Sequence, residues 1–323
     1  MDSITQAILG AAVGEAVIGK NIGNKGAIAG ALIATIPDLD VFLTFFLSPL
    51  QNISVHRGYS HSIVFSILLA ILLTWWMKRR KWAQHVPALR LYAFSFLALF
   101  THIMLDAFTT YGTQLFLPFS DYRVSFDSIN IVDPFYTIPL LIGLVASLIV
   151  ARKIHMRRSM PNTVGLIISS TYLLFTLVNQ HRVESEYDQA LKLRGIVAEN
   201  ILTAPVKVGS MYWYGVGRTQ DSLYIGQYSR LDSKDIEFTA FPVNDHLLDG
   251  LDPYLVNRLK WFAQGYYVVA EKDGKIRVYN MQCDMQGVRH YGDYLAPTAF
   301  YYEIEPHADH SYNLSVGMHS RKD

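Results

Sequence analysis

The sequence predicts a multi-pass α-helical membrane bundle of about six helices, followed by a small α+β domain on the extracytoplasmic side. Long apolar runs fill residues 1–180 of the 323-residue chain, which we interpret as a helical membrane domain. Only 17% of all residues are charged, against roughly a quarter in an ordinary soluble domain. Residues 181–323 instead have the mixed composition of a soluble domain. We therefore expect a membrane protein with a soluble portion.

Six apolar segments are long enough, or nearly long enough, to cross roughly 30 Å of hydrocarbon. They are residues 3–19, 25–47, 61–77, 91–108, 135–151 and 163–178. Pro37 is expected to break the second segment. Glycines recur along the first two segments, so we expect these to form a closely packed pair. The glycines are Gly10, Gly14, Gly19, Gly23, Gly26 and Gly30.

Lys and Arg residues gather in three of the connections between these segments, at residues 20–25, 78–90 and 152–158. The positive-inside rule places such loops in the cytoplasm. With six spans, the N-terminus and everything after about residue 180 then lie outside.

The part after residue 180 contains seven segments that alternate or are rich in Tyr, Val and Ile, as strands are. They are residues 206–216, 222–229, 236–241, 266–271, 275–279, 299–305 and 312–318. A helix is expected at residues 245–263, and Trp213 is expected in the strand core. His307, His310 and His319 are interpreted as a frayed polar tail. The net charge of +1 gives no reason to expect a nucleic-acid partner, and the single Cys283 cannot form an internal disulfide.

His and Asp residues recur through the apolar part in three short blocks. The candidates are Asp38, Asp40, His56, His61, His102 and Asp106. One ionisable side chain at the centre of a bilayer costs roughly 2.5–3.5 kcal/mol or more. The predicted topology brings all six residues to the outer end of the bundle. A shared metal ion is the simplest way to offset the cost.

The spacing within each block suits metal ligands. His102 and Asp106 are four residues apart, which places them on one face of a helix. Asp38 and Asp40 follow the proline that interrupts a helix. Mixed His and carboxylate ligands suit zinc, and also manganese or iron, whereas mostly oxygen ligands favour magnesium. The candidates are numerous enough for two metals, but they do not establish two.

Each of these residues also has a simpler interpretation. His56 could be a solvated loop residue, Asp38 could cap a helix, and His102 with Asp106 could form a structural hydrogen bond. Arg57 is either a surface cation or, beside this cluster, a ligand for a phosphate group. Taken together on one membrane face, the residues favour a metal site.

The blocks Pro-Asp-x-Asp at 37–40, His-Arg-Gly-x-Ser-His-Ser at 56–62 and His-x-x-x-Asp at 102–106 resemble a known family. It comprises the bacterial inner-membrane metal-dependent hydrolases, with a LexA-binding branch, and the resemblance covers roughly residues 1–180. The family is distantly similar to zinc-dependent phospholipases C and S1/P1-type nucleases. The resemblance implies Asp40 or Asp38, His61 or His56, His102 and Asp106 as ligands. It also implies a location in the bacterial cytoplasmic membrane.

One position departs from the family pattern. Many members have a His after an early Thr, but here Thr5 is followed by Gln6, a poor ligand for a transition metal. Either one metal is lost, or a carboxylate such as Asp2 or Asp133 replaces the ligand.

The chemistry implied is metal-assisted hydrolysis, in which Asp38 or Asp40 acts as the base and Arg57 binds an anion. The expected substrate is a phosphoester or another lipid-derived molecule that reaches the site from the bilayer. The alternative is a non-catalytic membrane protein with a structural metal site and an outer interaction or regulatory domain. A transporter is a third possibility, but we find no convincing internal repeats.

Overall fold

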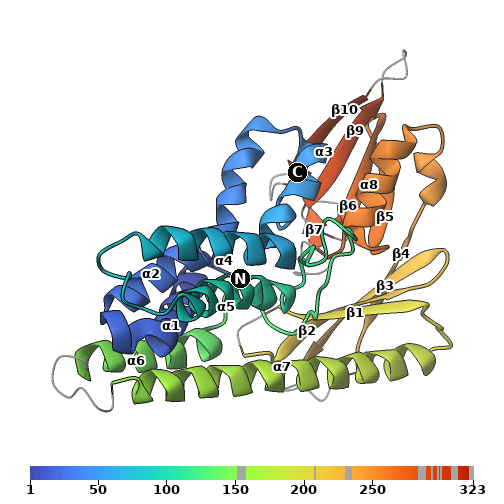
Figure 1. Ribbon diagram of the computed structural model, residues 1–323. Coiled ribbons are helices and arrows are strands. Elements are labelled where there is room, and N and C mark those ends of the chain that lie inside the picture. Colours follow the sequence, from blue (N-terminus) through green and yellow to red (C-terminus); the bar gives the residue numbers. More distant parts are fainter. Residues whose placement is uncertain are drawn as a thin grey trace. The chain divides into compact units, whose positions relative to one another are not determined.

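The chain divides into two compact units in a computed structural model (Figure 1). The first comprises Met1–Phe45 and Val55–Leu177, and the second comprises Phe46–Ser54 and Val178–Asp323. The structure describes residues 1–150, 158–206, 209–229, 235–282, 289–291, 294–296, 298, 300–306 and 312–319. Cys283, His307 and His310 lie outside the described residues, as do residues 152–157 of the third basic loop.

The first unit is built from helices. They are α1 Ser3–Ile22, α2 Lys25–Ala34, the 3₁₀ helices η1 Pro37–Phe46 and η2 Tyr59–His61, α4 Ile63–Lys78, α5 Ala88–Ala107, α6 Pro134–Val150 and the first part of α7 Met160–Lys192. Pro37 begins η1 and so ends the second apolar segment as a regular α-helix, as predicted. Asp2 caps α1 by accepting a hydrogen bond from the backbone N–H of Thr5 at 3.0 Å.

The helices α1 and α2 form the closely packed pair that the glycines predict. A Cβ atom added to Gly14 would lie 2.1 Å from the carbonyl oxygen of Gly26, and one added to Gly10 would lie 2.4 Å from that of Gly30. Only glycine permits this approach of two backbones. Phe94 of α5 packs on the same pair, in a core with Leu9, Ile18 and Leu99. The pair therefore forms one wall of the bundle beside α5.

Three helical segments of the described chain are long and apolar enough to cross a membrane, fewer than the six predicted. They are Lys25–Phe46, Ala88–Ala107 and Met160–Lys192, and a fourth exists if Pro49–His61 and Ile63–Lys78, bent by 51°, count as one span. The helix α1 is not among them, although it has 20 residues; its sequence includes the polar Gln6, Glu15, Lys20 and Asn21. The helix α6 is shorter, with 17 residues.

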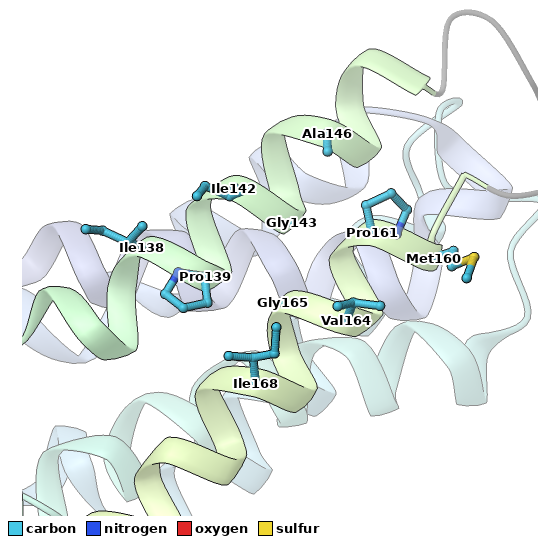
Figure 2. A pocket seen from close by; sticks show the side chains of 10 residues that line it. All are labelled: Ile138, Pro139, Ile142, Gly143, Ala146, Met160, Pro161, Val164, Gly165 and Ile168. Carbon is cyan, nitrogen blue, oxygen red and sulfur yellow. The ribbon is translucent and has the colours of Figure 1, made fainter.

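The helices α6 and α7 cross where two glycines meet. A Cβ atom on Gly143 would lie 2.6 Å from the carbonyl oxygen of Pro161, and one on Gly165 would lie 2.6 Å from that of Pro139. Figure 2 shows the apolar pocket beside this crossing, which has a volume of about 520 Å³. Only apolar residues and these glycines line it, so it has the character of a helix-packing surface.

The second unit contains α3 Pro49–Val55, the second part of α7, and two four-stranded antiparallel sheets. The first sheet has the order β1-β2-β3-β4, with β1 Asn200–Pro205, β2 Tyr212–Arg218, β3 Ser222–Ser229 and β4 Phe238–Pro242. The second has the order β10-β9-β6-β5, with β5 Tyr267–Lys272, β6 Lys275–Asn280, β9 Phe300–Pro306 and β10 Tyr312–Met318. A short pair joins β7 Arg289–Tyr291 to β8 Tyr294–Ala296.

Tyr187 of α7 attaches this helix to the first sheet. Its hydroxyl donates toward the carbonyl oxygens of Gly215 at 2.7 Å and Tyr224 at 2.9 Å. A Cβ atom on Gly215 would lie 2.2 Å from the Tyr187 ring, so glycine makes room for the phenol. Trp213 is fully buried on β2, which confirms its predicted place in the strand core.

Three expectations for this unit were wrong in detail. The segment 206–216 is not one strand, because the chain turns between β1 and β2. The helix expected at 245–263 is broken before Pro253 into η4 Asp245–Leu248 and α8 Pro253–Ala263. His319 is buried rather than frayed, with its Nε2 atom 3.0 Å from the hydroxyl of Tyr279.

Candidate metal centre

Four side chains from the predicted blocks converge on one point. Asp38 comes from η1, His61 from η2, and His102 and Asp106 from α5. One candidate ligand atom of each residue lies within 4.8 Å of the other three. His61, His102 and Asp106 are at most 1% exposed, whereas the Asp38 side chain is 24% exposed. Access to the cluster is therefore on the side of Asp38.

Five distances among these atoms match the edges of a tetrahedral metal site. The Nε2 atom of His61 lies 3.5 Å from Asp38 Oδ1 and 3.3 Å from Asp106 Oδ2. The Nε2 atom of His102 lies 3.4 and 3.5 Å from the same two oxygens, and 3.3 Å from His61 Nε2. Metal–ligand bonds of about 2.0–2.2 Å in a tetrahedron separate the ligand atoms by about 3.3–3.6 Å. The residues present therefore fit a four-coordinate divalent cation such as zinc.

Local structure explains why these four side chains meet. His102 and Asp106 lie one turn apart on the buried face of α5, as their spacing predicts. The break at Pro37 starts a 3₁₀ helix that carries Asp38 in its first turn. His61 ends η2, and the following Ser62 caps α4 by accepting a hydrogen bond from the Phe65 N–H at 3.1 Å. Two helix boundaries and one helix face thus supply the ligands.

Asp40 lies behind His61 rather than among the four converging atoms. Its Oδ2 atom lies 3.3 Å from His61 Nδ1 and accepts hydrogen bonds from Ser60 Oγ at 2.8 Å and the Arg57 N–H at 3.0 Å. Ser60 Oγ lies closer to His61 Nδ1, at 2.9 Å, and itself donates to Asp40. When the Nδ1–H of His61 is donated to this Ser60–Asp40 pair, the lone pair on Nε2 faces the cluster. Carboxylates commonly orient a metal-binding imidazole in this way.

His56 lies at the rim of the site. Its Nδ1 atom is 3.0 Å from Asp40 Oδ1, and its side chain is 32% exposed. The ring packs edge-on against Tyr111, with the centroids 5.4 Å apart. Asp40 therefore contacts both predicted histidines of the second block, of which only His61 is in the four-residue cluster.

Arg57 contacts the opposite side of Asp106. Its Nη2 atom lies 3.2 Å from Asp106 Oδ1, and its Nη1 atom donates to Thr109 Oγ1 at 2.8 Å. Arg57 is buried, and its backbone has φ of 56°, a left-handed conformation that is uncommon outside glycine. The guanidinium thus fixes one oxygen of Asp106, while the other oxygen faces the two histidines.

Gln6 is also part of the site, although it does not replace the missing histidine as a converging ligand. Its Nε2 group donates to Asp106 Oδ1 at 3.1 Å and to the backbone carbonyl of His102 at 3.2 Å. The amino group of Met1 contacts the same oxygen of Asp106. This carboxylate is therefore held from three directions.

The two carboxylates considered as replacements for that histidine cap helices instead. Asp2 caps α1. Asp133 accepts hydrogen bonds from the Phe135 N–H at 3.0 Å and the Tyr172 hydroxyl at 2.8 Å. The four ligand atoms assembled in the described residues thus point to one metal position.

Sequence reasoning missed Ser60 and Thr109 as members of the site. Ser60 directly precedes His61, and Thr109 follows Asp106 by three residues, so their proximity was available from the sequence. Their hydrogen bonds depend on the turns at η2 and at the end of α5, which no residue pattern specified.

The fold and the site define a class: a membrane protein with a buried candidate metal centre. The chain belongs to the YdjM inner membrane protein family, whose model matches residues 1–183. This match confirms the predicted inner-membrane family, and the hydrolase activity stays a prediction.

Two curated relatives are similar to this chain. "Uncharacterized protein YfhP" of Bacillus subtilis strain 168 is 28% identical over 245 residues, which cover 70% of this chain and 68% of the relative. "Inner membrane protein YbcI" of Escherichia coli strain K12 is 31% identical over 122 residues, which cover 37% of this chain and 69% of the relative. No solved structure matches the chain at a significant level.

Proposed function

We propose that this protein is a metal-dependent hydrolase of the bacterial cytoplasmic membrane, acting on a phosphoester or another lipid-derived substrate. One observation carries the proposal: the ligand atoms of two imidazoles and two carboxylates meet within 4.8 Å of one another, and one carboxylate is partly exposed. Structural zinc sites are typically rich in Cys, whereas catalytic sites use His with a carboxylate and keep one position open. The donor set and the exposed Asp38 therefore favour a catalytic metal.

The residues have separable roles in this proposal. Asp38, His61, His102 and Asp106 would hold the cation, which when bound generates a nucleophile from water at neutral pH and polarises a phosphoryl oxygen. Asp40 orients His61 through Nδ1. Asp38 and His56 have exposed atoms, so either can accept a proton and pass it to solvent.

Arg57 has a different role from the anion ligand that the sequence suggested. Its guanidinium contacts Asp106 and Thr109, and its Cζ atom lies 5.1 Å from the centre of the Tyr111 ring. We therefore assign it to positioning Asp106.

The charges at the helix ends support an orientation with the site outside. Arg79 and Arg80 follow α4, at the end opposite His61, and Arg158 precedes α7. The positive-inside rule places these ends in the cytoplasm. This orientation requires α6 to cross the bilayer as well, because Asp133 precedes it on the outer side and Arg158 follows it on the cytoplasmic side. The metal centre and the residues after α7 then lie on the extracytoplasmic side of a multi-pass protein.

The alternative is a structural metal in a non-catalytic protein with an outer interaction or regulatory domain. Four protein ligands can close a tetrahedral site, and three of them are fully buried, which is the specific observation in favour of this alternative. The two proposals differ in whether the protein with metal bound hydrolyses a substrate.

Purified protein should therefore be analysed for metal, stripped with a chelator, and assayed on phosphoester lipids after addition of zinc, manganese or magnesium. We expect about one metal per chain, with hydrolysis lost on chelation and restored by one of these metals. His102→Ala should lose both the bound metal and the hydrolysis. Asp249→Asn, a change at an exposed position in the other unit, should alter neither metal content nor hydrolysis. Metal without hydrolysis of any phosphoester would support the structural alternative, and no metal would reject both proposals.

The orientation has its own test. A Cys283→Ser background with Asp249→Cys, an exposed position in the second unit, should react with a membrane-impermeant maleimide in intact cells. Labelling only after the membrane is opened would overturn the extracytoplasmic placement.

A further inference from the structure

An apolar groove lies between α2 and α4, and the chain after α2 continues to Asp38 of the metal centre. Its volume is about 470 Å³. Ile28, Leu32 and Ile36 contribute to one wall, and Leu73 and Trp76 contribute to the other. Of the residues that line the groove, Lys25 alone is charged. The groove is thus suited to hydrocarbon along nearly its whole length.

One wall of the groove is continuous with a predicted metal ligand. Ile36 lies two residues before Asp38, and its carbonyl oxygen accepts a hydrogen bond from the Leu39 N–H at 3.1 Å. On the other wall, Leu73 is the lining residue of α4 nearest to His61 in sequence, twelve residues after it. Asp38 is also the exposed member of the cluster. Asp38, on the accessible side of the metal centre, is therefore only two residues from the Ile36 end of the groove.

The surroundings of the groove favour a lipid chain as its occupant. Ile28 is 62% exposed and Leu32 is 66% exposed, and this apolar surface continues onto Leu39 and Phe42 of η1. At membrane depth such a surface meets hydrocarbon, and an unfilled groove would forfeit dispersion contacts along both walls. The nine residue steps of α2 from Lys25 to Ala34 correspond to about 14 Å of helix, so this wall can contact a hydrocarbon chain of roughly that length.

We propose that this groove holds the hydrocarbon chain of the substrate while its phosphoester group lies at the metal centre. The inference rests on the proposed hydrolase function and narrows its substrate class to phosphoesters that carry a long alkyl, acyl or isoprenoid chain. Asp38 marks the boundary between the polar and apolar parts of the bound molecule.

Two chromogenic phosphodiesters with the same reacting group test this proposal: p-nitrophenyl hexadecyl phosphate and p-nitrophenyl ethyl phosphate. Ala29 lines the groove and is small, so Ala29→Phe should block it. We expect this variant to raise KM for the hexadecyl compound about ten-fold, the effect of losing contact with about two methylene groups. KM for the ethyl compound should change less than about two-fold.

Leu72→Phe is the matched control, because Leu72 is 56% exposed on α4 and does not line the groove. It should leave KM for both compounds unchanged. Should Ala29→Phe fail to fold, Leu32→Trp places a bulky ring at an exposed part of the same wall. Equal KM changes for both compounds in a folded blocking variant would overturn the groove assignment but leave the hydrolase function intact.

A binding measurement separates the groove from catalysis altogether. If neither phosphodiester is hydrolysed, the proposed function fails, and retention of hexadecyl phosphate and ethyl phosphate is compared by native mass spectrometry. Stronger retention of hexadecyl phosphate, weakened about ten-fold by Ala29→Phe, would still support the groove. Equal retention by the wild type and Ala29→Phe would overturn it.

Discussion

Two groups of buried ionisable side chains contact α1: the Glu15–Arg158 ion pair and the candidate metal centre. In the first, each charge has a partner side chain of opposite charge, whereas in the second, carboxylates and imidazoles gather around one point. Near the end of α1, Glu15 accepts hydrogen bonds from Arg158 Nε at 2.7 Å and Nη2 at 2.6 Å, and Asn24 contacts the same guanidinium at 3.0 Å. Near its start, the metal-centre residues bring two carboxylate oxygens and two imidazole nitrogens to one point. The ion pair is complete in itself, whereas the four candidate ligand atoms of the cluster lie within 4.8 Å of one another, close enough to share a cation.

The comparison shows how the same residue types can serve structure or chemistry inside an apolar bundle. A bidentate pair satisfies both partners, and its removal exposes a buried charge. Donor atoms held at the spacing of a tetrahedral metal site are stabilised most when a cation binds between them. Four predictions, in order of expected size, test this distinction.

The largest effect is expected from Arg158→Ala, because Glu15 is fully buried and would lose its counter-charge. Breaking such a pair costs about 3–5 kcal/mol of unfolding free energy. Unfolding in mixed detergent micelles measures this loss, and the double variant Glu15→Gln with Arg158→Gln should recover part of it. Metal content per folded chain should stay unchanged, and loss of the metal from folded Arg158→Ala would contradict the separation of the two regions.

The next largest effect is expected from His102→Ala, which removes one of four ligand atoms. One ligand represents about a quarter of the roughly 10–16 kcal/mol that a four-ligand zinc site supplies, so metal affinity should fall about 10²–10³-fold. Metal titration of the chelated protein provides the measurement. A folded variant with wild-type affinity would show that the cluster is a hydrogen-bonded structural group.

A smaller effect is expected from Asp40→Asn, because Asp40 orients His61 without joining the four converging atoms. Loss of such a partner typically lowers metal affinity or activity about 10–100-fold. The site should still fill at high metal concentration, which distinguishes this variant from His102→Ala. Asp245→Asn, the same chemical change on the other unit, should leave metal affinity unaltered.

The smallest effect is expected at the partly exposed pair formed by Asp245 and Lys260, whose charged atoms lie 2.7 Å apart. Burial opposes ionisation of Asp245, but hydrogen bonds from Lys260 and Tyr267 prevail and lower the pKa of the carboxyl group. Its contribution to stability is therefore present above its unfolded pKa of about 3.9 and is lost as pH falls through the lower folded value. Exposed pairs contribute about 0.2–1 kcal/mol.

Thermal unfolding of the wild type and Asp245→Asn between pH 3 and 7 tests this last prediction. The small difference seen at pH 7 should disappear toward the acidic end. A difference as large as that of Arg158→Ala would show that exposure does not distinguish these two ion pairs.

Sequence reasoning predicted the helices of the first unit well because their apolar runs are long and their boundaries carry strong signals. The glycines of α1 and α2 indicated a close pair, and Pro37 indicated the break before Asp38. The number of spans was overestimated, because hydropathy alone treated α1 and α6 as equivalent to the longer apolar helices. In the second unit, short strands and the turn between β1 and β2 depended on sheet pairing, which local patterns do not specify.

The sequence by itself determined which residues could bind a metal and that His102 and Asp106 share a helix face, because helical periodicity is a local property. Only the tertiary structure decided that Asp38 and His61 join them, while Asp40 and His56 contact each other outside the four converging atoms. The same applies to Arg57, whose side chain binds Asp106 instead of open solvent. The physical reason is that the register of separate helices depends on packing, and here the close contact of α1, α2 and α5 sets it.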